Sequence, residues 1–112
     1  MRINVTYFDQ NESFGRALPE SGVVGTVVRR ISLRDWGEDW CLLELEQPFE
    51  YEGRQHRHVL IRSRWQGYSI GDVEPTSVFV LLVPDSGVLQ NESFASEDFE
   101  QAAWSMARTV AN

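Results

Sequence analysis

Alternating polar and apolar residues in the first half of the chain predict short antiparallel strands. Residues 2–8 alternate as in a half-buried strand, and residues 23–33 are rich in β-branched side chains. Within the second segment, Gly25 predicts a bulge or a close approach of two backbones. Residues 40–46 resume a strand pattern, which Pro48 should end or confine to a sheet edge. We therefore expect three strands in this half.

Residues 49–65 predict a long hairpin around a glycine-containing loop. A three-residue loop would pair Tyr51 with Gln55 and set Glu44 opposite Arg62. The same register gives three further neighbours: Leu45 beside Ile61, Leu43 beside Ser63, and Cys41 beside Trp65. A two-residue loop would instead place Glu44 against Ile61 and mix polar with apolar residues on both faces. Since a register slip turns side chains to the wrong face, we expect the first register.

Residues 77–83 form a strand without alternation, because the run Val78–Val83 is continuously apolar. Such a run is typical of a central strand that is covered on both faces. Residues 9–22 predict a loop in which a short helical turn ends at Gly15. The central strand is therefore the expected centre of the fold.

The C-terminal segment predicts an amphipathic helix over about residues 97–110. Ser96 is a suitable N-cap, and acidic residues follow it in the first turn, where they suit the helix dipole. Apolar residues recur at helical spacing: Phe99, Ala102, Ala103, Met106 and Val110. The expected fold is mainly β (α+β), a small antiparallel β-barrel or rolled sheet of five to six strands with this one helix. Residues 1–112 form a single domain.

The composition narrows the classes of partner. The net charge of −7 argues against nucleic-acid binding and against anionic membranes. All ten basic residues are arginines, and seven of them lie between residues 29 and 64, where seven acidic residues accompany them. The N-terminus lacks the apolar stretch of a signal peptide, and no apolar run is long enough to span a membrane. The sequence therefore indicates an acidic, cytoplasmic protein.

No motif in the sequence specifies a reaction. His56 and His58 share one face of a strand, but they are the only two histidines, and zinc and iron sites usually need three or four protein ligands. Cys41 lies among apolar residues, which favours a buried, unreactive thiol. Nucleophile-elbow and phosphate-binding loop patterns are missing from the sequence. We therefore predict no catalytic residue, no metal and no cofactor.

The strongest candidate for a binding surface is one face of the predicted hairpin. It combines arginine and histidine side chains with aromatic residues just beyond them, and an exposed tryptophan in the preceding turn extends it. The candidate binding residues are His56, His58, Arg62, Arg64, Trp65, Tyr68 and Trp36. As an alternative, Glu44 and Glu46 on the facing strand would neutralise these arginines as cross-strand pairs.

These features favour a non-catalytic protein-binding or accessory module. Its partner would be another protein or a second copy of the chain, the latter through exposed edge strands. The alternative is a small-molecule binder or barrel enzyme whose mouth holds an anionic ligand with Arg62, Arg64 and the histidines. A third function is single-stranded nucleic-acid binding on an open barrel, with Trp65 and Tyr68 stacking on bases, which the charge opposes.

Overall fold

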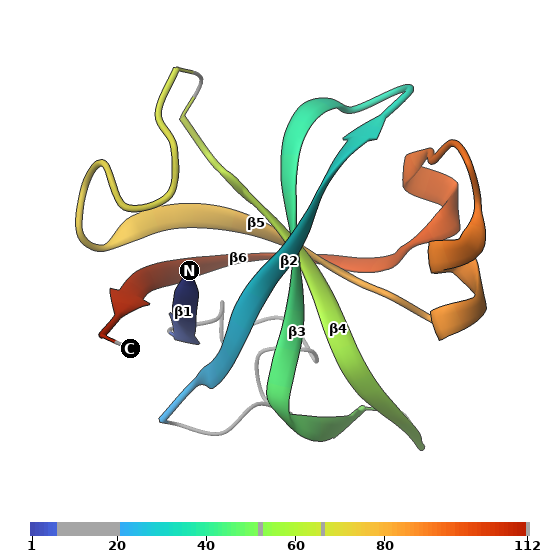
Figure 1. Ribbon diagram of the computed structural model, residues 1–112, viewed down its shortest axis with the longest axis horizontal. Coiled ribbons are helices and arrows are strands. Elements are labelled where there is room, and N and C mark those ends of the chain that lie inside the picture. Colours follow the sequence, from blue (N-terminus) through green and yellow to red (C-terminus); the bar gives the residue numbers. More distant parts are fainter. Residues whose placement is uncertain (7–20, 52, 66, 112) are drawn as a thin grey trace.

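Six antiparallel strands form a closed barrel in the computed structural model, which describes residues 1–6, 21–51, 53–65 and 67–111. The strands are β1 (Arg2–Thr6), β2 (Val23–Leu33), β3 (Gly37–Tyr51), β4 (Arg54–Ser63), β5 (Thr76–Leu82) and β6 (Glu100–Val110). Each strand pairs with the next one along the chain, and β6 pairs back with β1 (Figure 1). The helical turn predicted before Gly15 lies outside the described residues.

The predicted C-terminal helix is wrong, because the segment forms β6 between β5 and β1. Without this strand the barrel would leave two edges with unpaired backbone groups, and pairing them outweighs a local helix preference. Ser96 does begin a helical turn, but only the short 3₁₀ turn η2 (Ser96–Asp98). The described residues contain no α-helix, so the fold is all-β. No helix there is long and apolar enough to cross a membrane.

The predicted hairpin register is also wrong. Tyr51 pairs with Arg54, which leaves a two-residue loop, and Glu44 lies opposite His58 rather than Arg62. The pairing shifts between Glu44 and Phe49, around Pro48, which has no backbone N–H for a ladder hydrogen bond. Because His58 and Arg62 differ by an even number of positions, they keep the same face of β4. The arginines therefore point outward as expected, although their neighbours differ.

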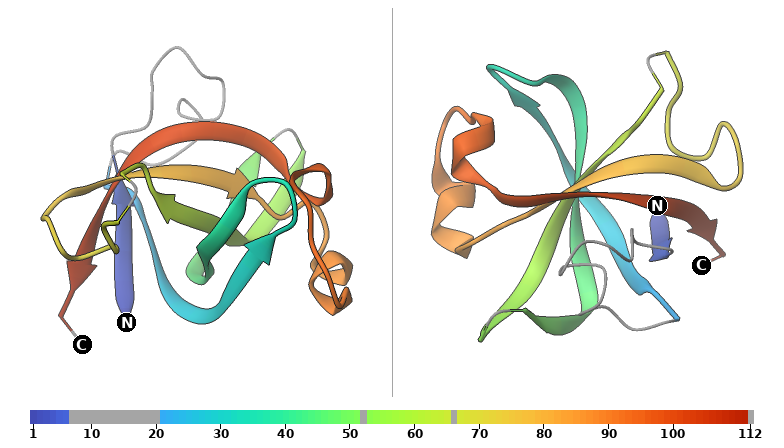
Figure 2. Two further views of the ribbon diagram at one scale, coloured as in Figure 1. Left: turned by 90° about the horizontal axis from the view of Figure 1, so that it is seen from above. Right: turned by 180° about the vertical axis from the view of Figure 1, so that it is seen from behind.

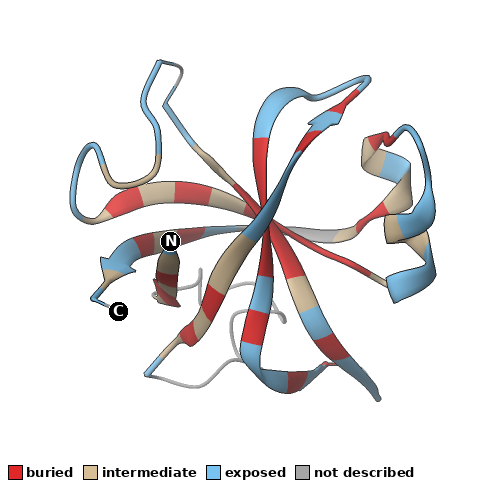
Figure 3. Cartoon of the chain, in the orientation of Figure 1, coloured by how far each residue is buried: buried red, intermediate tan, exposed pale blue. Residues whose placement is uncertain are grey.

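The barrel interior is filled from all six strands. Its members are Ile3, Val5, Val23, Cys41, Leu43, Leu45, Phe49, Tyr51, Val59, Ile61, Val78, Val80, Leu82 and Ala107. The red bands along the strands in Figure 3 mark buried positions of this kind. Gly25 permits a close backbone approach, as predicted: a Cβ atom there would lie 2.9 Å from the Glu44 carbonyl oxygen. The bulge in β2 lies at Val28 instead, where the pairing with β3 shifts.

A second apolar layer covers the outside of the barrel on one side. The connection from β5 to β6 contains η1 (Ser86–Gln90) and η2 and lies beside the barrel (Figure 2). Its apolar side chains pack on outward-facing residues of β2 to β5. The buried members of this layer are Ile31, Leu33, Trp40, Leu42, Leu60, Leu81, Val83, Phe94 and Phe99. The prediction that both faces of residues 78–83 are covered is confirmed except at Phe79, which is only partly buried on the outer face, and this connection takes the place of the expected helix.

Candidate functional site

Outward-facing residues of β4, β5 and β6 form a row of aromatic and arginine side chains. Arg62 pairs with Phe79, and Phe79 pairs with Trp104 on the next strand. The rings of Phe79 and Trp104 meet edge to face, with centroids 4.6 Å apart. Trp36, in the turn between β2 and β3, lies 5.7 Å from the same phenylalanine ring. The pairing of β5 with β4 and with β6 thus gathers residues that are far apart in the sequence.

Both arginines of this row lie against tryptophan rings. The Arg64 guanidinium carbon is 5.1 Å from the Trp65 ring and 4.8 Å from the Trp104 ring, so two indoles flank it. The Arg62 guanidinium lies 5.7 Å from the Trp40 ring and donates a 2.5 Å hydrogen bond to the Trp36 carbonyl oxygen. Such contacts hold a guanidinium in place through cation–π attraction.

Three of the indoles remain open to solvent. Trp36 is 42%, Trp65 57% and Trp104 43% exposed. Together with Arg62, Arg64 and Phe79 they form what we call the arginine–tryptophan face. A groove of about 420 Å³ is lined by all of these residues except Trp65. Large exposed rings of this kind mark contact surfaces more often than chance placement does.

The predicted neutralisation of the arginines by Glu44 and Glu46 is wrong. Glu44 lies opposite His58, and Glu46 forms an ion pair with Arg2 at 2.7 Å. Among the described residues, no carboxylate lies within 4.0 Å of the Arg62 or Arg64 guanidinium. The arginine–tryptophan face therefore carries two positive charges that form no ion pair within the described residues.

The predicted histidines do not join this face. His56 is buried, stacks on the Phe49 ring at 5.4 Å, and its Nδ1–H donates to the Val83 carbonyl oxygen at 3.2 Å. The hydrogen bond to Val83 fixes the orientation of the imidazole ring. The contact with Phe49 places this ring within the packed core near the β3–β4 hairpin. His58 is partly buried opposite Glu44. In the described part of the chain, no group of three or more His, Cys, Asp or Glu side chains is placed to hold a metal ion.

Two residues of the arginine–tryptophan face were missed by the sequence reading. Trp104 is not among the apolar positions named for the predicted helix, and Phe79 appears only as part of the predicted central strand. A signal for Trp104 does exist, because Trp104, Met106 and Arg108 alternate with the small buried residues Ser105 and Ala107. The same segment thus has an alternating pattern, typical of a strand, and apolar residues at helical spacing. Trp104 comes to lie beside Phe79 only when the segment forms a strand.

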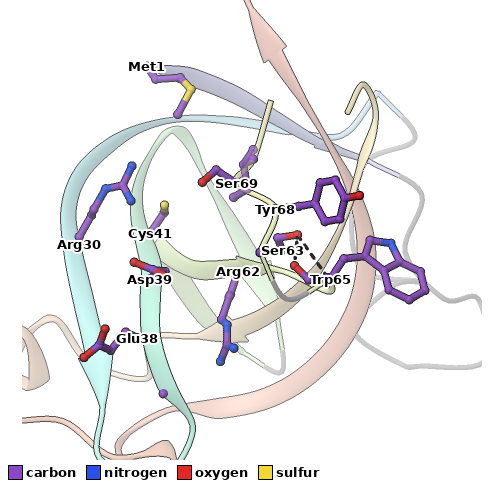
Figure 4. Close-up of a pocket in the computed structure, with 13 residues that line it drawn as sticks. Met1, Arg30, Glu38, Asp39, Cys41, Arg62, Ser63, Trp65, Tyr68 and Ser69 are labelled. Atoms are coloured by element: carbon purple, nitrogen blue, oxygen red, sulfur yellow. Dashed lines mark hydrogen bonds between the residues drawn. The ribbon is translucent and has the colours of Figure 1, made fainter. Parts of the chain in front are cut away.

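A separate cavity opens at the barrel mouth, between the β2–β3 turn and the β4–β5 loop (Figure 4). It has a volume of about 460 Å³, and Cys41 lies between Arg30 and Asp39 in this view. Burial raises the pKa of the Cys41 thiol; Arg30 acts in the opposite direction, and Asp39 adds to the rise. The thiol is therefore protonated near neutral pH, which opposes a nucleophilic role.

Tyr68 and Trp65 lie at the border between the arginine–tryptophan face and the mouth cavity. Tyr68 is 55% exposed, and both residues line the mouth cavity and a neighbouring outer groove with Met106. Figure 4 shows both rings at the rim, turned away from Cys41. Of the predicted site residues, Trp36, Arg62, Arg64, Trp65 and Tyr68 thus lie on one side of the barrel, and the two histidines lie elsewhere.

Two carboxylates fasten the loops that border these regions. Hydrogen bonds from the Ser96 hydroxyl and backbone N–H hold the pKa of Asp35 below its ordinary value of 3.8. The Thr109 hydroxyl donates to Glu74 at 2.5 Å, and with the Thr109 backbone N–H it holds the pKa of Glu74 below 4.5. Asp35 thereby ties the turn before Trp36 to η2, and Glu74 ties the β4–β5 loop to β6.

These two carboxylates predict an acid-sensitive contribution to stability. Their pKa values are lower in the folded protein, so the contribution is complete above the ordinary carboxyl range and is lost as the pH falls through the folded values. Asp35→Asn with Glu74→Gln should therefore lower the urea midpoint at about pH 7 and reduce its further decline towards about pH 3. Glu50→Gln, an exposed change on β3, is the control. An unchanged pH profile of the double variant would contradict this role.

No protein-family model matches the chain, and neither a curated protein nor a solved structure shows significant similarity to it.

Proposed function

We propose that this chain is a non-catalytic binding module that recognises an acidic segment of another protein through its arginine–tryptophan face. The observation that carries the proposal is the position of Arg64. Its guanidinium carbon lies 5.1 Å from the Trp65 ring and 4.8 Å from the Trp104 ring, and it has no carboxylate partner among the described residues. Arg64 is therefore held in place and keeps its charge available.

The chemistry of this arrangement suits a carboxylate. A guanidinium held by cation–π contact can still use its N–H groups to bind a carboxylate in bidentate fashion. Since the rings already restrain Arg64, less rotamer entropy is lost on binding than for a free side chain. Tryptophan and arginine are also the residues that dominate binding hot spots. The exposed rings of Trp36 and Trp104 would bury apolar side chains of the same segment.

The closed barrel argues against two other functions. Self-association through edge strands needs unpaired strands, and every described strand is paired on both sides. Single-stranded nucleic acid would also stack on exposed indoles, but the net charge of −7 opposes a polyanion. A short acidic protein segment needs only the local charge of Arg62 and Arg64.

The proposal is tested with a photo-crosslinking residue at position 68, beside the face, in cells that produce the chain. We expect a protein adduct whose cross-linked segment, identified by mass spectrometry, is acidic. The matched control carries the same crosslinker at position 57, an exposed site on β4 close to the β3–β4 hairpin. Adducts to a second copy of the chain or to nucleic acid would contradict the proposal, as would a yield at position 68 no higher than at position 57.

Variants of the face should then weaken binding of the identified segment without unfolding the barrel. Arg64→Ala removes an exposed side chain and should leave the thermal midpoint nearly unchanged, whereas Trp104→Ala also removes the ring contact with Phe79 and should lower the midpoint modestly. Each variant should raise the Kd at least about tenfold. Calorimetry with a synthetic peptide of the segment measures the change, with Arg57→Ala as control. Equal Kd values for all three variants would place the binding surface elsewhere.

A further inference from the structure

We propose that the barrel mouth binds a small zwitterion, an α-amino acid with an apolar side chain, between Arg30 and Asp39. This site adjoins the arginine–tryptophan face, with Arg62 and Trp65 at their shared border, and it adds a small-molecule ligand to a protein-binding module. The cavity volume of about 460 Å³ lies within the range of small-molecule sites, and barrel mouths are common places for them.

A β-bulge aims Arg30 at this cavity. Without the irregularity at Val28, continued alternation from the inward-facing Val27 would turn Arg30 to the outside of β2. The bulge instead sets Arg30 opposite Cys41, a residue of the barrel interior, and Arg30 lines the cavity. Bulges commonly redirect a side chain beside functional sites. The fold therefore places a guanidinium at the mouth that strand alternation alone would have placed outside.

Asp39 supplies the opposite charge. Its backbone φ of 69° is the only positive value among the described residues other than glycine, and it lies in the left-handed region that aspartate tolerates better than most residues. Arg30 and Asp39 both influence the pKa of the intervening Cys41 thiol, in opposite directions. Yet the structure shows no ion pair or hydrogen bond between them in the described part of the chain. Two unpaired opposite charges thus border one cavity.

Two further charged side chains, Glu38 and Arg62, line the cavity. Arg62 is turned away from Cys41 in Figure 4 and is bound to the Trp36 carbonyl oxygen. Glu38 also lies at the edge, beyond Asp39 in the same view. A simple anion would be attracted by Arg30 but repelled by the Asp39 carboxylate. A simple cation would be attracted by Asp39 but repelled by Arg30. A zwitterion satisfies both charges together.

The rest of the cavity suits a short apolar side chain. Cys41 is 5% exposed and protonated, and Ile70 packs against the barrel interior beside it. Ser63 and Ser69 provide hydroxyls at the side. These groups would contact the aliphatic side chain of the ligand. The ammonium and carboxylate groups of the ligand would then bind Asp39 and Arg30. Because the thiol is not ionised, we infer reversible binding and no covalent step.

The test uses the purified chain and L-leucine as probe, with two analogues that each lack one charge. N-acetyl-L-leucine has no ammonium group, and L-leucinamide has no carboxylate. We expect calorimetry at millimolar concentration to detect L-leucine and to show at least about tenfold weaker binding of each analogue. Binding of N-acetyl-L-leucine or L-leucinamide as tight as that of L-leucine would overturn the zwitterion assignment. Failure of L-leucine and of the other apolar amino acids to bind would overturn the site itself.

Two variants locate the site. Arg30→Gln and Asp39→Asn remove one charge each with little change in shape, and asparagine tolerates the left-handed backbone at position 39. Each should weaken L-leucine binding at least about tenfold and leave the circular dichroism spectrum unchanged. Arg57→Gln, at an exposed site outside the lining of this cavity, should bind like the parent protein. Parent-like binding by Arg30→Gln or Asp39→Asn would place the ligand elsewhere.

Discussion

A chain that ends after Phe99, and therefore lacks β6, is expected to lose its cooperative thermal unfolding transition. β6 pairs with both β1 and β5, so its removal opens the barrel at two edges. Ala107, which is fully buried in the interior, is lost at the same time. The loss should exceed the roughly 5–15 kcal/mol of total stability that is typical of a small domain.

The control for this truncation ends the chain after Val110. It keeps all of β6 and removes only residues 111–112, which contribute one exposed hydrogen bond from Arg2 to the Ala111 carbonyl oxygen. Its transition should stay within a few degrees of the full chain. If the shorter chain also melted cooperatively near the parent midpoint, β6 would not be needed to close the barrel.

Replacing Leu60 with alanine is expected to lower the free energy of unfolding by about 2–5 kcal/mol. Leu60 has no exposed surface and belongs to the outer apolar layer, where the β5–β6 connection covers the central strands. Truncation leaves a cavity within this layer, since the surrounding packed structure relaxes only in part. Urea denaturation monitored by tryptophan fluorescence measures the change.

Val73→Ala is the comparison for this core variant. Val73 is 56% exposed in the β4–β5 loop, so its truncation should change stability by less than about 0.5 kcal/mol. A similarly small effect of Leu60→Ala would show that the connection does not seal this side of the barrel. The contrast between the two positions thus tests the second apolar layer, which the sequence did not reveal.

The local hydrophobic pattern was sufficient to predict the secondary structure wherever one pattern dominated a segment. The strand at residues 23–33 agrees with β2, and the apolar run at residues 77–83 predicted a strand covered on both faces. The outward position of Arg62 and Arg64 also followed from alternation, and it survived a wrong register because the error was an even number of residues. Successive side chains of a strand point to opposite faces, so residues an even number of positions apart share a face whatever the register.

Tertiary structure alone decided features that depend on pairing between distant segments. The segment at residues 97–110 has both a helical and an alternating pattern, and the need to pair the edges of β1 and β5 selects the strand. The bulge at Val28 turns Arg30 into the mouth, and the composition of β2 gives no sign of it. Trp104 meets Phe79 and Arg64 only because its segment forms a strand that pairs with β5. Such choices are made by hydrogen bonding and packing across the whole barrel, to which each local segment contributes only a small part of the free energy.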